Sequence, residues 1–159
     1  MLLLKLIFLL AVANGTPVLA RKFLGDRCAW PLDGGLRFVD GRPLFGASKT
    51  VRGALLSVLL STATAPLLGL PIDAGSLIGA LAMIGDLLSS FAKRRLGFAP
   101  GQRATGLDQI PESLLPLVGC RYFFLLDLEE IALGTAMFCV GEIVLSRLLY
   151  RLKLRERPY

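Results

Sequence analysis

Residues 74–92 read AGSLIGALAMIGDLLSSFA and are followed directly by the basic run KRR at positions 93–95. The stretch is apolar apart from small hydroxyl side chains and Asp86, and it is as long as a helix must be to cross the hydrocarbon layer of a bilayer. We therefore predict a membrane-spanning helix here. Small residues let neighbouring helices approach closely, so we expect close contacts at its three glycines, Gly75, Gly79 and Gly85.

The composition of the whole chain also favours a membrane protein. Of its 159 residues, 54% are hydrophobic, and the mean hydropathy is +0.64. A soluble domain of this size lacks the interior volume to hide so much apolar surface from water. We predict an all-α, polytopic membrane helical bundle in a single domain over residues 1–159, with two functional cytoplasmic loops. Its five transmembrane helices are expected at residues 1–20, 53–70, 74–92, 113–126 and 131–149.

Three of these stretches have alternatives or irregularities. Residues 1–20 could be a cleaved signal peptide, but the dense charges follow the apolar run, which is the reverse of a signal peptide's charge order. We therefore expect a retained first span. Pro66 predicts a kink in the second span. Residues 113–126 are short and interrupted by Arg121, so a re-entrant segment is the alternative to a full crossing.

The positive charge is concentrated on one side of the predicted bundle. The chain carries a net charge of +6, and its isoelectric point is about 9.7. Lysine and arginine gather in residues 21–52, in residues 93–112 and in the C-terminal tail, whereas the other two connections carry only acids. This alternation is typical of basic cytoplasmic loops, so we expect these segments in the cytoplasm and the N-terminus outside the cell membrane. It also argues against nucleic acid as the partner of the basic residues.

Histidine and cysteine usage limits the chemistry. The absence of histidine excludes His-based acid–base catalysis and His-ligated zinc. The three cysteines form no CxxC pair, which argues against a disulfide framework or a thiolate metal site. Any catalysis must use carboxylates, lysine, arginine, hydroxyls and a hard metal ion.

An ionisable residue inside a predicted span is Asp86, and such residues are costly and usually functional. The alternative is a structural ion pair or hydrogen bond with another helix. Helical spacing places Asp86 on one face with Ser89, Ser90, Lys93 and Arg94. A carboxylate on the same helix face as two cations suits a site for a metal ion and a phosphate. The basic run by itself is also explained by positive-inside anchoring.

Glu142 in the fifth predicted span and Arg121 in the fourth are also ionisable residues. They raise the same question as Asp86, and a pair between them is one explanation.

Residues 21–52 are rich in glycine and charge and are too long for a simple connector. Gly46 and Gly53 bracket a run of Ser, Lys, Thr and Arg that could wrap a phosphate. The run is not a P-loop, because the GxxxxGK[ST] order is absent.

Four segments follow one another along the chain: NGTPVLA from Asn14, DGRPLFGASKTVRG from Asp40, GDLLSSFAKRRLG from Gly85 and LDQIPESLLPL from Leu107. In this order they resemble the CDP-archaeol synthase family, relatives of the bacterial phosphatidate cytidylyltransferases. The last two also resemble the broader signature of those enzymes. The Lys-Asp pair and the Gly-Gly-x-x-Asp-Arg stretch of that signature are missing, which favours the archaeol-type branch.

The resemblance implies a magnesium-dependent enzyme of phospholipid biosynthesis that transfers CMP from CTP to a membrane lipid phosphate at the cytoplasmic face. The lipid is archaeol-type or phosphatidic acid. Because the lipid phosphate is already an anion, the chemistry needs positioning and charge neutralisation more than a strong base. The expected magnesium ligands are Asp86 and Asp108, with Lys93 also catalytic. The expected substrate-binding residues are Asn14, Lys49, Thr50, Arg52, Ser90 and Arg94, with Lys93 joining the phosphate clamps.

Two other functions compete with this prediction. A CDP-alcohol phosphotransferase would carry a DGxxAR motif followed by further aspartates, and neither Asp33-Gly34 nor Asp40-Gly41 continues into it. A non-enzymatic scaffold or transporter subunit explains the spans and the charge pattern. It does not explain why a carboxylate, cations and a glycine-rich loop converge.

Overall fold

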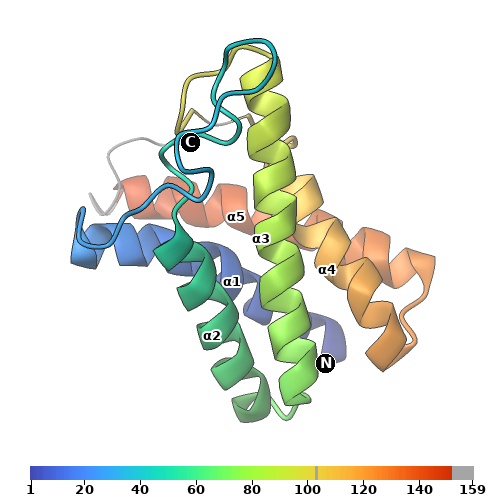
Figure 1. Ribbon diagram of the computed structural model, residues 1–159. Helices are drawn as coiled ribbons and strands as arrows, with labels where there is room; N and C mark the ends of the chain where they lie inside the picture. Colours follow the sequence, from blue (N-terminus) through green and yellow to red (C-terminus); the bar gives the residue numbers. More distant parts are fainter. Residues whose placement is uncertain (103, 152–159) are drawn as a thin grey trace.

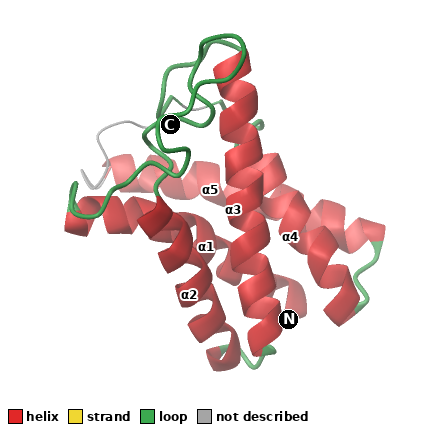
Figure 2. Cartoon of the chain, viewed as in Figure 1, coloured by secondary structure: helices red, strands yellow, loops and turns green. Residues whose placement is uncertain are grey.

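The computed structural model describes residues 1–102 and 104–151, and all regular secondary structure in them is helical (Figures 1 and 2). The predicted all-α bundle is confirmed, and each predicted apolar stretch corresponds to one helix, although residues 1, 68–70 and 125–126 lie beyond the ends of their helices. The basic tail at 152–159 lies outside the described residues. The helices are α1 (Leu2–Leu24), α2 (Val51–Leu67), α3 (Ile72–Arg95), α4 (Gln109–Phe124) and α5 (Leu128–Arg151).

The helix ends differ from the predicted spans where polar residues continue a helix. α1 runs through the basic residues Arg21 and Lys22 to Leu24, and α3 includes the whole basic run to Arg95. α4 begins at Gln109, so a turn that was expected in the polar loop is helical. The prediction of a kink at Pro66 is wrong, because α2 ends one residue later, at Leu67, and the proline lies in its last turn.

α3 is the central helix of the bundle. It packs against α2 and α4, which flank it, while α1 contacts all four other helices (Figure 1). α1 and α3 are long and apolar enough to cross a membrane, and α2 is a shorter apolar helix. Leucines of α1 reach the core that these helices share, where Leu6, Leu9 and Leu10 are fully buried.

The three glycines of α3 are contact points with neighbouring helices. A Cβ at Gly75 would lie 2.6 Å from the Cβ of Ala65, and one at Gly79 would lie 2.8 Å from the Cα of Val58, both in α2. A Cβ at Gly85 would lie 2.2 Å from the carbonyl oxygen of Pro111 in α4. The predicted close helix contacts are confirmed, because no larger side chain fits at these crossings without moving a helix.

Two loops lie together at the C-terminal end of α3 (Figure 1). The first covers residues 25–50 and contains isolated bridges between Pro31 and Thr50 and between Arg37 and Pro43. Arg42 ties this loop to α3, since its guanidinium donates to the carbonyls of Arg94 at 3.1 Å and Arg95 at 2.7 Å. The second loop connects α3 to α4. The fold thereby places both loops above one end of the central helix.

Candidate active site

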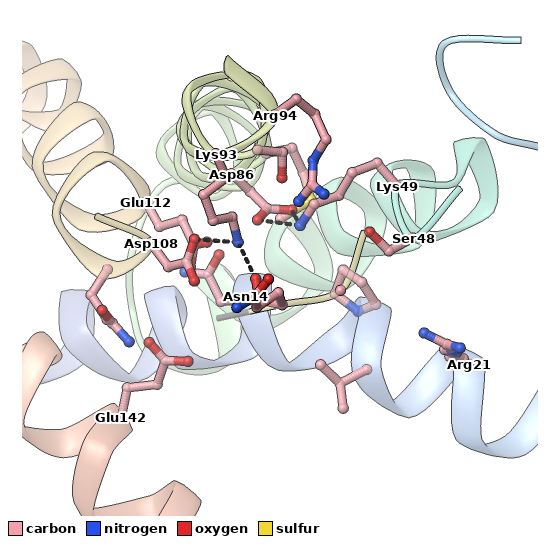
Figure 3. Close-up of a pocket in the computed structure, with 17 residues that line it drawn as sticks. Asn14, Arg21, Ser48, Lys49, Asp86, Lys93, Arg94, Asp108, Glu112 and Glu142 are labelled. Atoms are coloured by element: carbon pink, nitrogen blue, oxygen red, sulfur yellow. Dashed lines mark hydrogen bonds and ion pairs between the residues drawn. The ribbon is translucent and has the colours of Figure 1, made fainter. Parts of the chain in front are cut away.

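A pocket with a cavity volume of about 290 Å³ opens where both loops meet α1, α3, α4 and α5. Most of the side chains that converge on it are charged or polar (Figure 3). The lining residues that carry charge are Arg21, Lys49, Asp86, Lys93, Arg94, Asp108, Glu112 and Glu142. The pocket therefore combines carboxylates with cations in a bundle whose remainder is largely apolar.

The first ion pair of the pocket joins the first loop to α3. The ammonium group of Lys49 donates to both carboxylate oxygens of Asp86 (Figure 3). Both side chains are largely buried. An unpaired carboxylate at this depth would be costly, and the lysine supplies the opposite charge that offsets this cost.

The second ion pair joins α3 to the second loop. The Nζ atom of Lys93 lies 2.6 Å from Asp108 Oδ1 and also donates to the carbonyl of Gln102 at 3.0 Å (Figure 3). Asp108 Oδ2 accepts the backbone N–H of Ala104 at 2.9 Å. Because Lys93 is buried, these contacts replace the water that its charge would otherwise require.

A third carboxyl group lies against the first. Glu112, buried in the first turn of α4, is in hydrogen-bonding contact with Asp86. Glu142 of α5 lines the same pocket (Figure 3). The suggested pair between Arg121 and Glu142 is not supported, because Glu142 faces the pocket near the start of α4 while Arg121 is exposed near its end.

Arg94 contributes a buried cation to the pocket. One terminal nitrogen donates to the carbonyl of Phe98. Its Nε–H is buried and has no hydrogen-bond partner among the described residues. Buried donors are normally satisfied, so this one is available to an anionic ligand.

Seven of the nine predicted site residues line the pocket: Asn14, Lys49, Asp86, Ser90, Lys93, Arg94 and Asp108. The helical spacing of Asp86, Ser90, Lys93 and Arg94 is thus confirmed as a shared face. Ser89 lies apart from it, buried and donating to the carbonyl of Asp86 at 2.9 Å.

Thr50 and Arg52 do not line this pocket. Thr50 is the N-cap of α2, and its hydroxyl accepts the Gly53 N–H at 3.1 Å. The Arg52 guanidinium donates to the backbone carbonyls of Arg27 and of Gly25, the latter at 3.0 Å. The Arg52 guanidinium thus lies against the first loop, whereas Thr50 lines a small neighbouring cavity of about 40 Å³ together with Lys49 and Asp86. Contact of either side chain with a phosphate stays a prediction.

The pocket is also lined by Glu112, Gln109 and Arg21, which were not predicted as site residues, and by Glu142, which was singled out only as an ionisable residue within a span. Gln109 and Glu112 were expected in a loop, whereas both lie in the first turn of α4. The spacing of Gln109 and Glu112 at i and i+3 after Asp108 could have indicated one helix face. Arg21 was assigned to a loop, but α1 continues to Leu24 and carries it to the pocket rim.

The carboxylate oxygens of the pocket are the type of ligand that a hard divalent cation prefers. No three acidic, histidine or cysteine side chains in residues 1–102 and 104–151 are close enough to enclose a metal ion by themselves. Mg²⁺ is commonly held by one or two carboxylates together with water and substrate phosphates, so a partial set of ligands fits it. The ammonium groups of Lys49 and Lys93 pair with Asp86 and Asp108. The surroundings of both aspartates therefore favour positive charge.

The chain is similar along nearly its full length to CDP-archaeol synthases. The CDP-archaeol synthase of Pyrobaculum arsenaticum is 34% identical over 155 residues, covering 93% of this chain and 92% of its own. That of Sulfurisphaera tokodaii is 35% identical over 156 residues, covering 93% and 84%. A solved structure described as an intramembrane enzyme for archaeal membrane lipids biosynthesis has a TM-score of 0.77 and 29% identity, covering 88% of this chain and 89% of that one.

The family comparison extends over the whole sequence. The family model described as CarS-like CDP-archaeol synthase matches residues 1–159. Together with relatives above 30% identity over nearly the full length, this match shows that the chain is a membrane-embedded helical protein that belongs to the CDP-archaeol synthase family.

Proposed function

We propose that this protein is a CTP-dependent cytidylyltransferase that transfers CMP to a membrane lipid phosphate, forming a CDP-lipid of the CDP-archaeol type and pyrophosphate. The observation that carries the proposal is the pocket at the loop end of α3, where two Lys–Asp pairs and a buried arginine surround a cavity in an intramembrane bundle. Family membership supports the same reaction.

The reaction is a displacement at the α-phosphorus of CTP. An oxygen of the lipid phosphate forms a bond to this phosphorus while the bond to the bridging oxygen of the β-phosphate breaks, and pyrophosphate leaves. The attacking oxygen is already anionic, so the protein needs no general base. The pocket's task is to hold two anions together and to neutralise the charge that develops on the leaving group.

The cations are suited to this task by their position. Lys49 comes from the loop side, whereas Lys93 and Arg94 come from α3 (Figure 3). In the proposed complex the three side chains contact phosphate oxygens, and the buried Nε–H of Arg94 gains its missing partner. Ser90 and Asn14 are further hydrogen-bonding groups on the wall.

We further propose Mg²⁺ as the cofactor, held by Asp86 and Asp108. When bound, the ion neutralises phosphate charge and orients the triphosphate. Glu112 lies beside Asp86 as a further carboxyl group on the pocket wall. Treatment with a chelator should abolish transfer, and Mg²⁺ should restore it where Na⁺ at equal ionic strength does not.

The proposed topology has five spans, with both loops and the pocket on the cytoplasmic side of the cell membrane. The positive-inside distribution of lysine and arginine supports it. A cytoplasmic pocket gives CTP entry from water while the lipid chains remain between helices. Accessibility of single cysteines introduced at Ala47 and Glu129 to a membrane-impermeant reagent should place them on opposite sides.

The function is tested with membranes that contain the protein, archaeol phosphate or phosphatidic acid, and CTP labelled on either the α- or the γ-phosphorus. The α-label should enter the lipid fraction, and the γ-label should remain in water as pyrophosphate. A preference between the two lipid phosphates would identify the substrate. If the α-label does not enter either lipid in the presence of Mg²⁺, the protein is better interpreted as a non-enzymatic scaffold. Consumption of added CDP-lipid with release of CMP would instead indicate a CDP-alcohol phosphotransferase.

A further inference from the structure

Asp33 is a carboxylate that the proposed reaction does not use. It lies in the first loop, outside the pocket, and is 5% exposed. Every other residue from 21 to 45 is at least partly exposed. Buried aspartates are uncommon unless their charge is satisfied, so this one requires an explanation.

Both oxygens of Asp33 accept backbone N–H groups from two separate parts of the loop. Oδ1 accepts from Gly35 at 3.0 Å. Oδ2 accepts from both Phe45 and Gly46 at 2.9 Å. The carboxylate therefore joins residues 33–35 to residues 45–46 and closes the hairpin between them.

The charge state of Asp33 agrees with this geometry. Burial alone would raise its pKa, but the N–H groups of Gly46, Phe45 and Gly35 outweigh burial and hold the pKa below its usual value. Hydrogen bonds to the ionised form favour it, so the side chain is a carboxylate at neutral pH.

The segment that Asp33 holds leads directly to the pocket. Gly46 adopts a positive φ of 96°, and its carbonyl accepts the N–H of Lys49 at 3.1 Å. The carbonyl of Lys49 in turn accepts the N–H of Leu32 at 2.8 Å, next to Asp33. The backbone of residues 46–49 is thus fixed from both sides, and the side chains of Ser48 and Lys49 enter the pocket.

From this arrangement we infer that Asp33 is a positioning residue for cytidylyl transfer. Its carboxylate sets the turn at residues 45–49 and thereby delivers the Lys49 ammonium group to the pocket. The inference rests on the proposed function and assigns Asp33 no contact with substrate. A side chain that served only to stabilise the fold would act independently of Lys49.

The test compares Asp33→Asn with Asp26→Asn in purified, membrane-reconstituted protein. Asp26 is an exposed aspartate of the same loop, so the control makes the same change of charge without touching the turn. Asp33→Asn should raise the KM for CTP about 10-fold or more, since one charged hydrogen-bond acceptor is worth a change of that order. Amide exchange of the peptide covering residues 45–50 should accelerate. Asp26→Asn should change neither quantity.

Dependence on Lys49 separates positioning from general stability. In a Lys49→Gln background, Asp33→Asn should cause little additional loss, because the group that it positions is already gone. Unchanged kinetics and exchange in Asp33→Asn would overturn the inference, as would losses that multiply in the double variant. If Asp33→Asn does not fold, Asp33→Glu keeps the charge, displaces it by one methylene and is held to the same outcomes.

Failure of the proposed function gives a different result. Wild-type protein would then show no transfer with any lipid phosphate. If only the Asp33 inference fails, wild-type protein is active, and Asp33→Asn either is equally active or loses activity independently of Lys49.

Discussion

The two halves of α3 lie in the same helix but have different surroundings. The first half carries Gly75, Gly79 and Ile78 into contact with α2 and the apolar core. The second half carries Asp86, Lys93 and other polar side chains into the pocket. Packing holds the first half in place, whereas side chains of the second half form ion pairs with residues of the two loops.

This contrast separates assembly from chemistry. Buried charges cost desolvation free energy and contribute little net stability, even when they are paired. Shape-matched small residues and leucines supply the contacts that hold intramembrane helices together. We therefore expect changes in the polar half to affect turnover and changes in the apolar half to affect stability.

The largest expected effect comes from the two aspartates. Asp86→Asn or Asp108→Asn should lower kcat about 1000-fold or more, on the scale of removing one charged group from phosphoryl-transfer chemistry. Insertion should be unchanged, because the apolar half of α3 is intact. Transfer of label from CTP measures the loss, and the yield of membrane-extracted protein measures insertion. Near-normal turnover in either variant would remove that residue from the site.

A smaller loss is expected when a phosphate contact is removed but the carboxylates remain. Lys49→Gln should lower kcat/KM about 10- to 100-fold, the scale of one charged hydrogen bond. Lys5→Gln, at the other end of the bundle near Gly69, is the matched control and should leave kcat/KM unchanged. Steady-state kinetics in CTP measures both, and equal losses in the two variants would contradict the assignment of Lys49 as a phosphate contact.

The α3–α4 crossing tests packing at the boundary of the two halves. Gly85→Ala places a methyl group 2.2 Å from a backbone oxygen of α4 and should destabilise the fold by about 1–3 kcal/mol. Gly141→Ala adds the same methyl group to α5, where nothing lies within 4 Å, and should be neutral or slightly stabilising. Thermal unfolding in detergent compares the two. Equal unfolding temperatures would show that α4 moves aside without cost.

The smallest effect is expected at a buried hydrogen bond between α1 and α2. The Ser57 hydroxyl donates to the carbonyl of Ala13 at 2.7 Å. Ser57→Ala should cost about 0.6 kcal/mol, typical of hydrogen bonds between membrane helices. Kinetics should be unchanged, while the unfolding temperature falls slightly. A large loss of turnover would show that this contact supports the pocket as well.

The helices were predictable because each apolar stretch needs only its own length and composition to form one. The shared face of Asp86, Lys93 and Arg94 was predictable for a similar reason, since helical periodicity is local. The predictions failed where contacts with other parts of the chain determine the direction of a side chain. Arg52 follows Lys49 closely in sequence, yet its guanidinium donates to the carbonyls of Gly25 and Arg27 in the first loop and does not line the pocket.

By itself, the sequence determined a helical membrane protein and the family motifs, because hydropathy, charge order and motif spacing are properties of the chain alone. Only the tertiary structure decided which charges meet. The pairing of Lys49 with Asp86 and of Lys93 with Asp108, and the approach of Glu112 to Asp86, depend on how three helices and two loops pack. The physical reason is that the cost of a buried charge is met by partners distant in sequence, and no local pattern specifies them.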